Sequence, residues 1–401
     1  MDPPSAQLHQ EVREAVTRQL EHRRPLLHHL NADSSWLLQI PRPVAATKKG
    51  GRAYYNILID PWLAGGQSDV ARWFSQQWHR FESACKSIAE VEELAREVEI
   101  LASSGSRRPG SRRPPNGDTG DDDKQTLIDA VAISHEFTDH CHKETLLQID
   151  RYVPVFASEY AARLIRNWKH FHHVETVPAL ERDHPDWRAA SIPPLPEWLS
   201  IARLQEDADN LYYHSALVFS FTITPGPPPP PPSSSSSSAQ TTSNRSTRSR
   251  RTAALPNGWI PDEGGDQADD DAAECVIYTP HGVRPQALDP IVAASPPLSV
   301  LALIHGLHDV AIDAGFWWER NRDKQPLSQL NLGGANGVRV QRVTRAKYWV
   351  GTHDEVKWGS GLVNWFLRRK VISTETFSSF GILSESRNGT MWFLGTSLSF
   401  L

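Results

Sequence analysis

The stretch Ile133–Thr145 reads ISHEFTDHCHKET and directly follows an apolar run. It places His135, Asp139 and His140 within six residues of one another. Neutral imidazoles and carboxylates are the side chains that bind divalent metals in proteins, and several of them must converge on one ion. A phenylalanine, Phe137, stands in the middle of this cluster. The stretch therefore predicts a metal-binding loop in which Phe137 stands in place of one ligand.

Histidines also occur where other apolar runs begin or end. They are His214 within LYYHSALVF, His281 after CVIYTP, His305 and His308 with Asp309 after LSVLALI, and His353 after AKYWVGT. Binding sites are usually assembled in loops at one rim of a sheet, because rigid strands fix the side chains there. We therefore expect a metal site that includes Asp139, His140 and His353. His214 lies beside two tyrosines in an apolar run, and core packing explains it equally well.

Apolar runs of strand length alternate with helical patterns, which predicts an α+β fold with mixed sheets and outer helices. Strands are expected at SSWLLQIP, YYNILIDPWL, DAVAIS, VPVFAS, LSIARLQ, LYYHSALVFSFTI, ECVIYTP, LSVLALI and AKYWVGTHD. Apolar residues at three- and four-residue spacing between Val70 and Val98 predict a helix or a helix pair. The segment VNWFLRRK at 363–370 predicts a further helix.

Two segments rich in Pro, Ser, Gly and charge are expected to be disordered insertions. The expected division is an N-terminal helical segment at 1–34, the first part of one domain with a helical insertion at 35–102, a disordered insertion at 103–124, the metal-loop part at 125–224, a disordered low-complexity insertion at 225–272, and the second half of the domain at 273–401. The run GPPPPPP in the second insertion offers a candidate contact for an adaptor domain.

Charge and composition exclude several classes of partner. The net charge of −5 gives no overall attraction to nucleic acid or to an anionic membrane, so any such contact would be local. Three widely spaced cysteines predict neither a disulfide framework nor a cysteine-based zinc site. The N-terminus lacks the apolar core of a signal peptide, and no window reaches the length of a membrane span. We expect a soluble, cytoplasmic protein with a small-molecule substrate and no membrane partner.

Five blocks together resemble the ordered signature blocks of the metallo-β-lactamase superfamily, in particular its lactonase-like and phosphodiesterase-like branches. They are ILIDPWL, ISHEFTDHCH, YYHSALVF, VIYTPHG and YWVGTHDE, and they cover most of the chain outside the two insertions. The resemblance implies a four-layer αββα sandwich with a metal site along one edge of its sheets. The His-x-His-x-Asp-His loop of the family falls on His135, Phe137, Asp139 and His140, and the later ligands fall on His214, His281 and His353.

Two departures from the family pattern change the chemistry that the resemblance implies. Phe137 replaces the second loop histidine, and His281 stands where the family has an aspartate that bridges two metals. One of the two family sites therefore keeps only His135 and His214. The other keeps a full set, namely Asp139, His140, His353 and, as a neutral nitrogen ligand, His281. The resemblance then implies one divalent ion, with zinc as the first choice and iron or manganese as alternatives.

Hydrolysis by a metal-bound hydroxide is the activity that the resemblance implies, on an ester, lactone or phosphoester small molecule. Because a second metal would clamp the leaving oxygen, its loss favours ester or lactone hydrolysis over attack on a nucleic-acid phosphodiester. We assign catalysis to Asp139, with His308 and Asp309 as candidates for moving a proton or orienting a ligand. The alternative is a non-catalytic protein of this fold that keeps a residual or structural metal and binds partners. Phe137 favours that alternative, whereas the polar residues at every other ligand position favour the hydrolase.

Overall fold

A computed structural model of the chain describes residues 22–47, 51–105, 126–184, 186–205, 213–222, 273–312, 328–371, 390–391 and 398–399. The low-complexity insertion expected at 225–272, with its adaptor contact, lies outside the described residues. So does the insertion expected at 103–124, apart from residues 103–105, which end a helix. In the described part of the chain, no helix has both the length and the apolarity of a membrane span.

The first large sheet has seven strands in the order β19-β1-β2-β3-β6-β7-β8. Their bounds are β19 (Leu398–Ser399), β1 (Leu26–His29), β2 (Trp36–Pro41), β3 (Tyr54–Ile59), β6 (Ala130–Ile133), β7 (Val155–Ala157) and β8 (Val174–Thr176). The strands β1, β2 and β3 run antiparallel, whereas β3, β6, β7 and β8 run parallel. The carboxyl ends of β3 and β6 therefore lie at the same edge of this sheet.

The second large sheet has six strands in the order β18-β15-β12-β11-β10-β9. Their bounds are β18 (Thr390–Met391), β15 (Tyr348–Thr352), β12 (Leu298–Gly306), β11 (Ala273–Thr279), β10 (Ser215–Thr222) and β9 (Leu199–Gln205). Here β11, β12 and β15 run parallel, and β10 is antiparallel to both of its neighbours. The carboxyl ends of β11 and β15 and the start of β10 consequently share one edge.

One hydrophobic core lies between the two large sheets. On β2, Trp36, Leu38 and Ile40 face this core, and the intervening Leu37 packs on the opposite side of the sheet. Successive side chains of a strand point to opposite faces, so a strand with apolar cover on both sides needs an almost unbroken apolar sequence. The apolar runs in the sequence are almost unbroken because both faces of each large sheet are covered.

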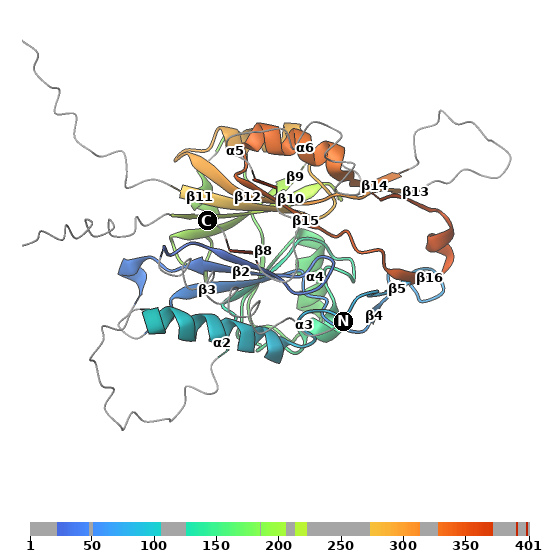
Figure 1. The fold of residues 1–401 in the computed structure, drawn as a ribbon, viewed down its shortest axis with the longest axis horizontal. Coiled ribbons are helices and arrows are strands. Elements are labelled where there is room, and N and C mark those ends of the chain that lie inside the picture. The colour runs from blue at the N-terminus through green and yellow to red at the C-terminus, as the bar shows by residue number, and fades with distance from the viewer. Residues whose placement is uncertain are drawn as a thin grey trace, which may run out of the picture.

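Helices cover the outer faces of both sheets (Figure 1). The first sheet carries α2 (Ile88–Gly105), α3 (Lys143–Leu146) and α4 (Glu159–Asn167), and the second carries α5 (Asp289–Val292) and α6 (Gly333–Thr344). Short 3₁₀ helices lie at Val44–Ala46, Trp187–Ala190, Pro285–Leu288 and Leu362–Trp365. The observed class is a mixed α/β structure, as the sequence predicted.

Two small three-stranded sheets lie together at one end of the molecule, on the right in Figure 1. One has the order β14-β13-β17, with β14 (Ser328–Leu332), β13 (Asp309–Ile312) and β17 (Leu367–Lys370). The other has the order β16-β5-β4, with β16 (Trp358–Ser360), β5 (Gln76–Trp78) and β4 (Gly66–Gln67).

Three expectations about secondary structure were wrong in part. The helical stripe expected from Val70 to Val98 is helical only from Ile88 onward, and residues 76–78 form β5. The helix expected at 363–370 is a 3₁₀ turn followed by the strand β17. In the helical segment expected at 1–34, residues 26–29 form the strand β1, while residues 1–21 lie outside the described residues. The first error has a physical cause: Trp78 and Phe81 are exposed side chains, so their spacing does not mark a buried face.

Candidate metal centre

The candidate metal centre lies where strands from both large sheets end. His135, Asp139 and His140 lie in the loop after β6, His281 lies two residues after β11, and His353 directly follows β15. The strand β6 belongs to the first sheet, and β11 and β15 belong to the second. His353 has a left-handed backbone, with φ of 55°, and its N–H donates to the carbonyl of Asp33 at 2.8 Å. The site thus joins the two sheets at one edge.

Three imidazole rings form a nearly regular triangle in this centre. The ring centroids of His140, His281 and His353 are 4.9–5.0 Å apart in every pair. The Nε2 atoms of His140 and His281 face each other at 3.1 Å. Imidazole nitrogens about 2.0–2.1 Å from a tetrahedral zinc ion would set the rings about 5 Å apart. The spacing therefore fits three imidazoles that converge on one ion.

Asp139 adds a carboxylate to the triangle. Its Oδ1 lies 3.7 Å from Nε2 of His140, and its Oδ2 lies 3.9 Å from Nε2 of His353. The candidate ligand atoms of Asp139, His140 and His353 all lie within 4.8 Å of one another, and His140 also belongs to a second such group with His135 and His281. Nitrogen and carboxylate ligands together form the donor set that zinc prefers in catalytic sites.

Each of the three imidazoles is oriented by an acceptor behind it. The Nδ1 atoms bond to Asp60 from His140 at 2.7 Å, to Asn331 from His281 at 2.7 Å, and to Asp33 from His353 at 3.1 Å. A histidine whose Nδ1–H donates to an acceptor presents the lone pair of Nε2, which is how metal-binding histidines are normally held. Two lone pairs that face each other at 3.1 Å repel unless a cation lies between them. A proton or a metal ion can serve as that cation.

The charges of the cluster also suit a metal. Burial holds the pKa of His281 well below its usual value, and the neighbouring imidazoles of His135 and His353 lower it further. Burial acts to raise the pKa of Asp139, but the nearby positive groups, Lys357 first, hold it well below its usual value. Burial also acts against charge on His140, yet the carboxylates of Asp139 and Asp60 raise its pKa. The site therefore contains an anionic carboxylate, a neutral imidazole and an imidazole that attracts positive charge.

Lys357 is a further cation that sequence reasoning did not identify. Its Nζ lies 2.8 Å from Oδ2 of Asp139 and 2.7 Å from Oδ2 of Asp33, and its side chain is only 5% exposed. The two carboxylates raise the pKa of Lys357 even though burial acts to lower it. Lys357 therefore holds one oxygen of Asp139 and leaves Oδ1 available to a metal.

Phe137 and His135 occupy the other side of the loop. The ring of Phe137 stacks on Tyr213, with centroids 4.8 Å apart and planes at 10°, and lies 5.9 Å from the ring of His135. Both ring nitrogens of His135 have partners within the protein: Nδ1 lies 2.8 Å from Oγ of Ser134, and Nε2 lies 3.0 Å from the carbonyl oxygen of Tyr213. Of the two candidate groups, the one without His135 has the freer ligand atoms.

Three other residues proposed from the sequence belong to neither candidate metal group in the described part of the chain. His214 is buried at the start of β10. His308 is buried with Nδ1 3.9 Å from Oδ1 of Asp354, and burial lowers its pKa to about 4. Asp309 lies in β13, where its carboxylate accepts from Nε2 of Gln329 at 2.5 Å.

The sequence did not predict the residues that orient the ligands, although a local motif marks the position of one of them. Asp60 directly follows the strand β3 and precedes a proline. It accepts from His140, from the hydroxyl of Tyr278 at 2.8 Å, and from the backbone N–H of Ser134 at 2.7 Å. The motif ILIDP predicted that a strand ends here, but it did not predict that Asp60 orients His140. Asp33, Asn331 and Lys357 carry no local signal, because their partners lie far away in the sequence.

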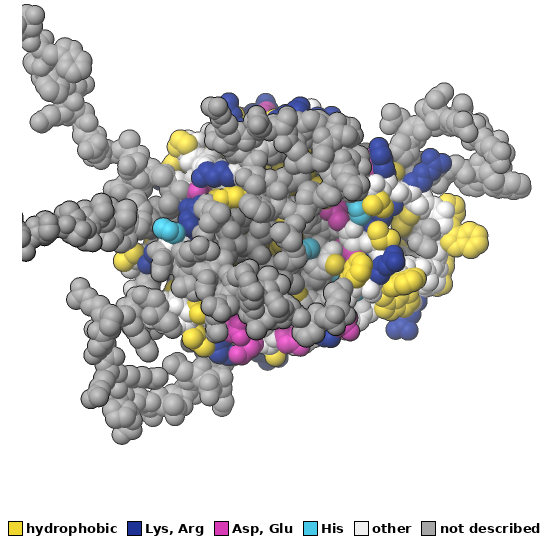
Figure 2. Space-filling model, in the orientation of Figure 1, with side chains coloured by type: hydrophobic (Ala, Val, Ile, Leu, Met, Phe, Trp, Pro, Cys, Tyr) yellow, Lys and Arg dark blue, Asp and Glu magenta, His cyan; other side chains and the backbone are white. Residues whose placement is uncertain are grey.

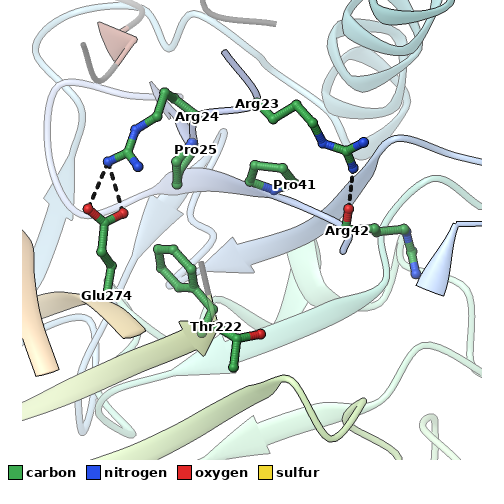
Figure 3. Close-up of a pocket in the computed structure, with 8 residues that line it drawn as sticks. Arg23, Arg24, Pro25, Pro41, Arg42, Thr222 and Glu274 are labelled. Carbon is green, nitrogen blue, oxygen red and sulfur yellow. Dashed lines mark hydrogen bonds and ion pairs between the residues drawn. The ribbon is translucent and has the colours of Figure 1, made fainter. Parts of the chain in front are cut away.

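A shallow pocket elsewhere on the molecule is lined by three arginines (Figure 3). It lies at the far ends of the second sheet's strands, beside Thr222 at the end of β10 and Glu274 near the start of β11. Arg24 pairs with Glu274 at 2.8 Å, Arg23 donates to the carbonyl of Arg42, and Arg42 pairs with Asp129 at 2.7 Å. These cations already have partners, so the pocket is explained by contacts that join the sheets.

Comparisons with known proteins give weak likenesses only. No protein-family model matches the chain, and no curated protein matches its sequence. The crystal structure of a possible metal-dependent hydrolase from Veillonella parvula DSM 2008 is similar at 11% identity with a TM-score of 0.45, covering 94% of this chain and 99% of that one. An isothiocyanate hydrolase from Delia radicum gut bacteria has 12% identity, the same TM-score and the same coverage. Likenesses at this level carry no statement about activity, and the chemistry rests on the site's own residues.

Proposed function

We propose that the chain is a metal-dependent hydrolase that uses one divalent ion, held by Asp139, His140, His281 and His353. One observation carries this proposal: three imidazoles have Nδ1 fixed by acceptors, and their rings converge at 4.9–5.0 Å beside a buried carboxylate. Acceptors on Nδ1 leave the Nε2 lone pairs of these histidines available to an ion, and the Nε2 atoms of His140 and His281 face each other at 3.1 Å.

The proposed architecture is the αββα sandwich of the metallo-β-lactamase superfamily. Two features support it: the two large sheets share one core, and helices pack on both outer faces. The position of the cluster supports this proposal, since five of the residues that fall on family ligand positions form two candidate metal groups that share His140.

Zinc is the metal that we propose, because three nitrogen ligands and one carboxylate match its preferred donors. Iron and manganese are the alternatives, since imidazole and carboxylate sites also bind them. A divalent ion in such a site lowers the pKa of water from roughly 15.7 to about 7 and polarises a carbonyl or phosphoryl group. The chain's own contribution is orientation: Asp60 and Asp33 fix two imidazoles, and Lys357 fixes Asp139.

We propose an ester, lactone or phosphoester small molecule as the substrate, with esters and lactones favoured. The support is the state of the other family site, where both nitrogens of His135 bond to the chain and Phe137 takes the place of a ligand. A single ion does not clamp both the attacking and the leaving oxygen, as two metals do in phosphodiesterases. In this proposal the buried His308 remains the candidate for proton transfer, and Asp309 contributes to β13.

The alternative function is a non-catalytic protein of this fold that keeps a residual or structural metal and binds partners. Lys357 favours a non-catalytic role, because an ammonium that already neutralises Asp139 leaves less negative charge for a catalytic ion. The same residue is compatible with the hydrolase, since Asp139 keeps a second oxygen.

Metal analysis and an esterase and lactonase panel test the proposal together. We expect protein produced with zinc to retain about one ion per chain. Asp139→Asn should lose the metal and any hydrolysis, because it removes the only anionic ligand. Asp150→Asn, at an exposed carboxylate outside both candidate metal groups, is the control and should retain both. A metal content near zero in the metal-supplied protein would refute the proposal. One ion per chain with no hydrolysis of any ester, lactone or phosphoester would support the structural alternative instead.

A further inference from the structure

The end of the molecule that carries β5 and β16 exposes an unusual number of large apolar side chains. Trp73, Trp358 and Trp365 have 71%, 62% and 86% of their surface exposed. Other exposed large apolar residues of the same two segments include Val70, Phe81, Leu362 and Phe366. We call these seven residues the aromatic lobe. Figure 2 shows apolar side chains gathered at this end of the molecule.

The two segments of the aromatic lobe are bonded to each other, although they are far apart in the sequence. The strand β16 pairs with β5, which sets Trp358 opposite Trp78, and the N–H of Leu362 donates to the carbonyl of Trp73 at 3.1 Å. The buried carboxylate of Glu355 accepts from the backbone N–H groups of Arg80 at 2.6 Å and Phe81 at 2.9 Å. These bonds present the aromatic side chains on a fixed frame.

Basic residues outnumber acids in the two segments of the aromatic lobe. Residues 70–82 and 356–371 contain five basic residues besides the buried Lys357, and their only acid is Glu82; Glu355, which directly precedes the second segment, is buried. The basic residues are Arg72, Arg80, Arg368, Arg369 and Lys370. Lys and Arg side chains lie beside the apolar ones in Figure 2. The whole chain has a net charge of −5, so this end is positive against the overall balance.

We propose that the aromatic lobe is a docking surface for an anionic lipid bilayer. Tryptophan is enriched where proteins meet the interface between lipid and water, because its ring is apolar and its N–H is polar. Basic side chains next to the surface add attraction to anionic lipid headgroups. An apolar patch alone would fit several partners, but exposed tryptophans with a basic surround and almost no acid match this one.

The aromatic lobe also lies next to the metal centre. Lys357, which holds Asp139, directly precedes Trp358, and the N–H of Thr138 donates to Asp69 at 2.9 Å, one residue before Val70. A bilayer docked on the lobe would bring amphiphilic esters close to the centre. That consequence rests on the proposed function, whereas the docking itself does not.

Vesicle co-sedimentation of the full chain tests the docking. We expect binding to vesicles that contain phosphatidylserine, weaker binding to phosphatidylcholine alone, and a loss at high salt. The double substitution of Trp73→Ser and Trp365→Ser should weaken binding on the order of tenfold or more. Replacing Arg368 and Lys370 by Gln should weaken it about fivefold for each charge. Tyr152→Ser, an exposed aromatic outside the lobe, is the matched control and should have no effect.

Several outcomes would overturn the docking proposal. The first two are an absence of binding to anionic vesicles and an equal loss of binding in the Tyr152 control. A concentration-dependent dimer that the tryptophan substitutions abolish, without lipid binding, would identify the lobe as a contact between copies of the chain. The assay is repeated with a chelator, because the proposal expects unchanged binding without metal. Lipid binding therefore stands or falls separately from hydrolysis.

Discussion

Removal of the Lys357 ammonium tests how the cluster balances its charge. Lys357→Met keeps the length of the side chain but leaves Asp33 and Asp139 without the cation that lies 2.7 and 2.8 Å from them. Removing one partner of a buried ion pair costs about 3–5 kcal/mol, because the remaining charge stays buried. The side chain is 5% exposed, so water offers little compensation.

The loss of stability in Lys357→Met should be larger without a bound metal ion than with one. For a domain of this size, 1 kcal/mol corresponds to about 2–4 °C in Tm, so the metal-free variant should melt roughly 6–20 °C below the parent. A divalent ion at Asp139 replaces part of the missing charge and should recover part of the loss. By linkage, the variant should bind metal at least about tenfold more tightly than the parent.

Thermal unfolding with chelator and with added zinc measures both effects. The matched control is Lys86→Met, since Lys86 is 55% exposed and pairs at 3.0 Å with Glu82, which is 86% exposed. An exposed pair of this kind contributes at most about 1 kcal/mol. If Lys357→Met behaves like the control, or if zinc shifts its Tm no more than that of the parent, the ammonium is not the counter-charge of the cluster and the reasoning fails.

Two further predictions concern one ligand and one buried histidine. Asn331→Leu removes the acceptor that holds Nδ1 of His281 and should weaken metal binding by about 10–100-fold in chelator competition; unchanged affinity would remove His281 from the ligand set. Burial lowers the pKa of His28 to about 4, so at pH 5 the unfolded chain binds a proton that the folded chain does not, and stability falls as the pH drops from 6.5 toward 4. His28→Gln keeps a donor for Gln39. Between pH 7 and pH 5, its free energy of unfolding, measured with urea, should fall by about 2 kcal/mol less than that of the parent. An equal loss in both proteins would contradict that assignment.

The sequence predicted the parts of the fold in which local pattern and tertiary packing agree. Strands such as β3, β6 and β11 have apolar residues on both faces, and a short apolar run between turn residues is a sufficient signal for them. The pattern failed between Val70 and Ile88, where apolar side chains form an exposed surface instead of a helix face. Periodicity reports which residues are apolar, and it does not report whether anything covers them.

The candidate site divides in the same way. His135, Asp139, His140, His281 and His353 were all named in advance, because each stands at the end of an apolar run. Asp33 and Lys357 were not, since they are 324 positions apart and meet only where the two sheets pack. The resemblance also placed His214 beside His135, but the group that lies there is the backbone carbonyl of Tyr213. A motif identifies the chemical type of a residue, whereas the partners that orient it come from the fold.

The meaning of Phe137 follows from its neighbours rather than from its identity alone. Its ring stacks on Tyr213, and the carbonyl of Tyr213 lies 3.0 Å from Nε2 of His135. Two departures from the pattern of the resemblance are therefore linked: a phenylalanine stands at 137, and the backbone carbonyl that precedes β10 bonds to Nε2 of His135. A single substitution at 137 would not free His135, so the loss extends beyond one residue. On the other side of the loop, Asp139 and His140 keep every contact that orients them. Two features therefore support the single-ion proposal. The carbonyl of Tyr213 bonds to Nε2 of His135, whereas Asp60 orients His140 and Lys357 orients Asp139.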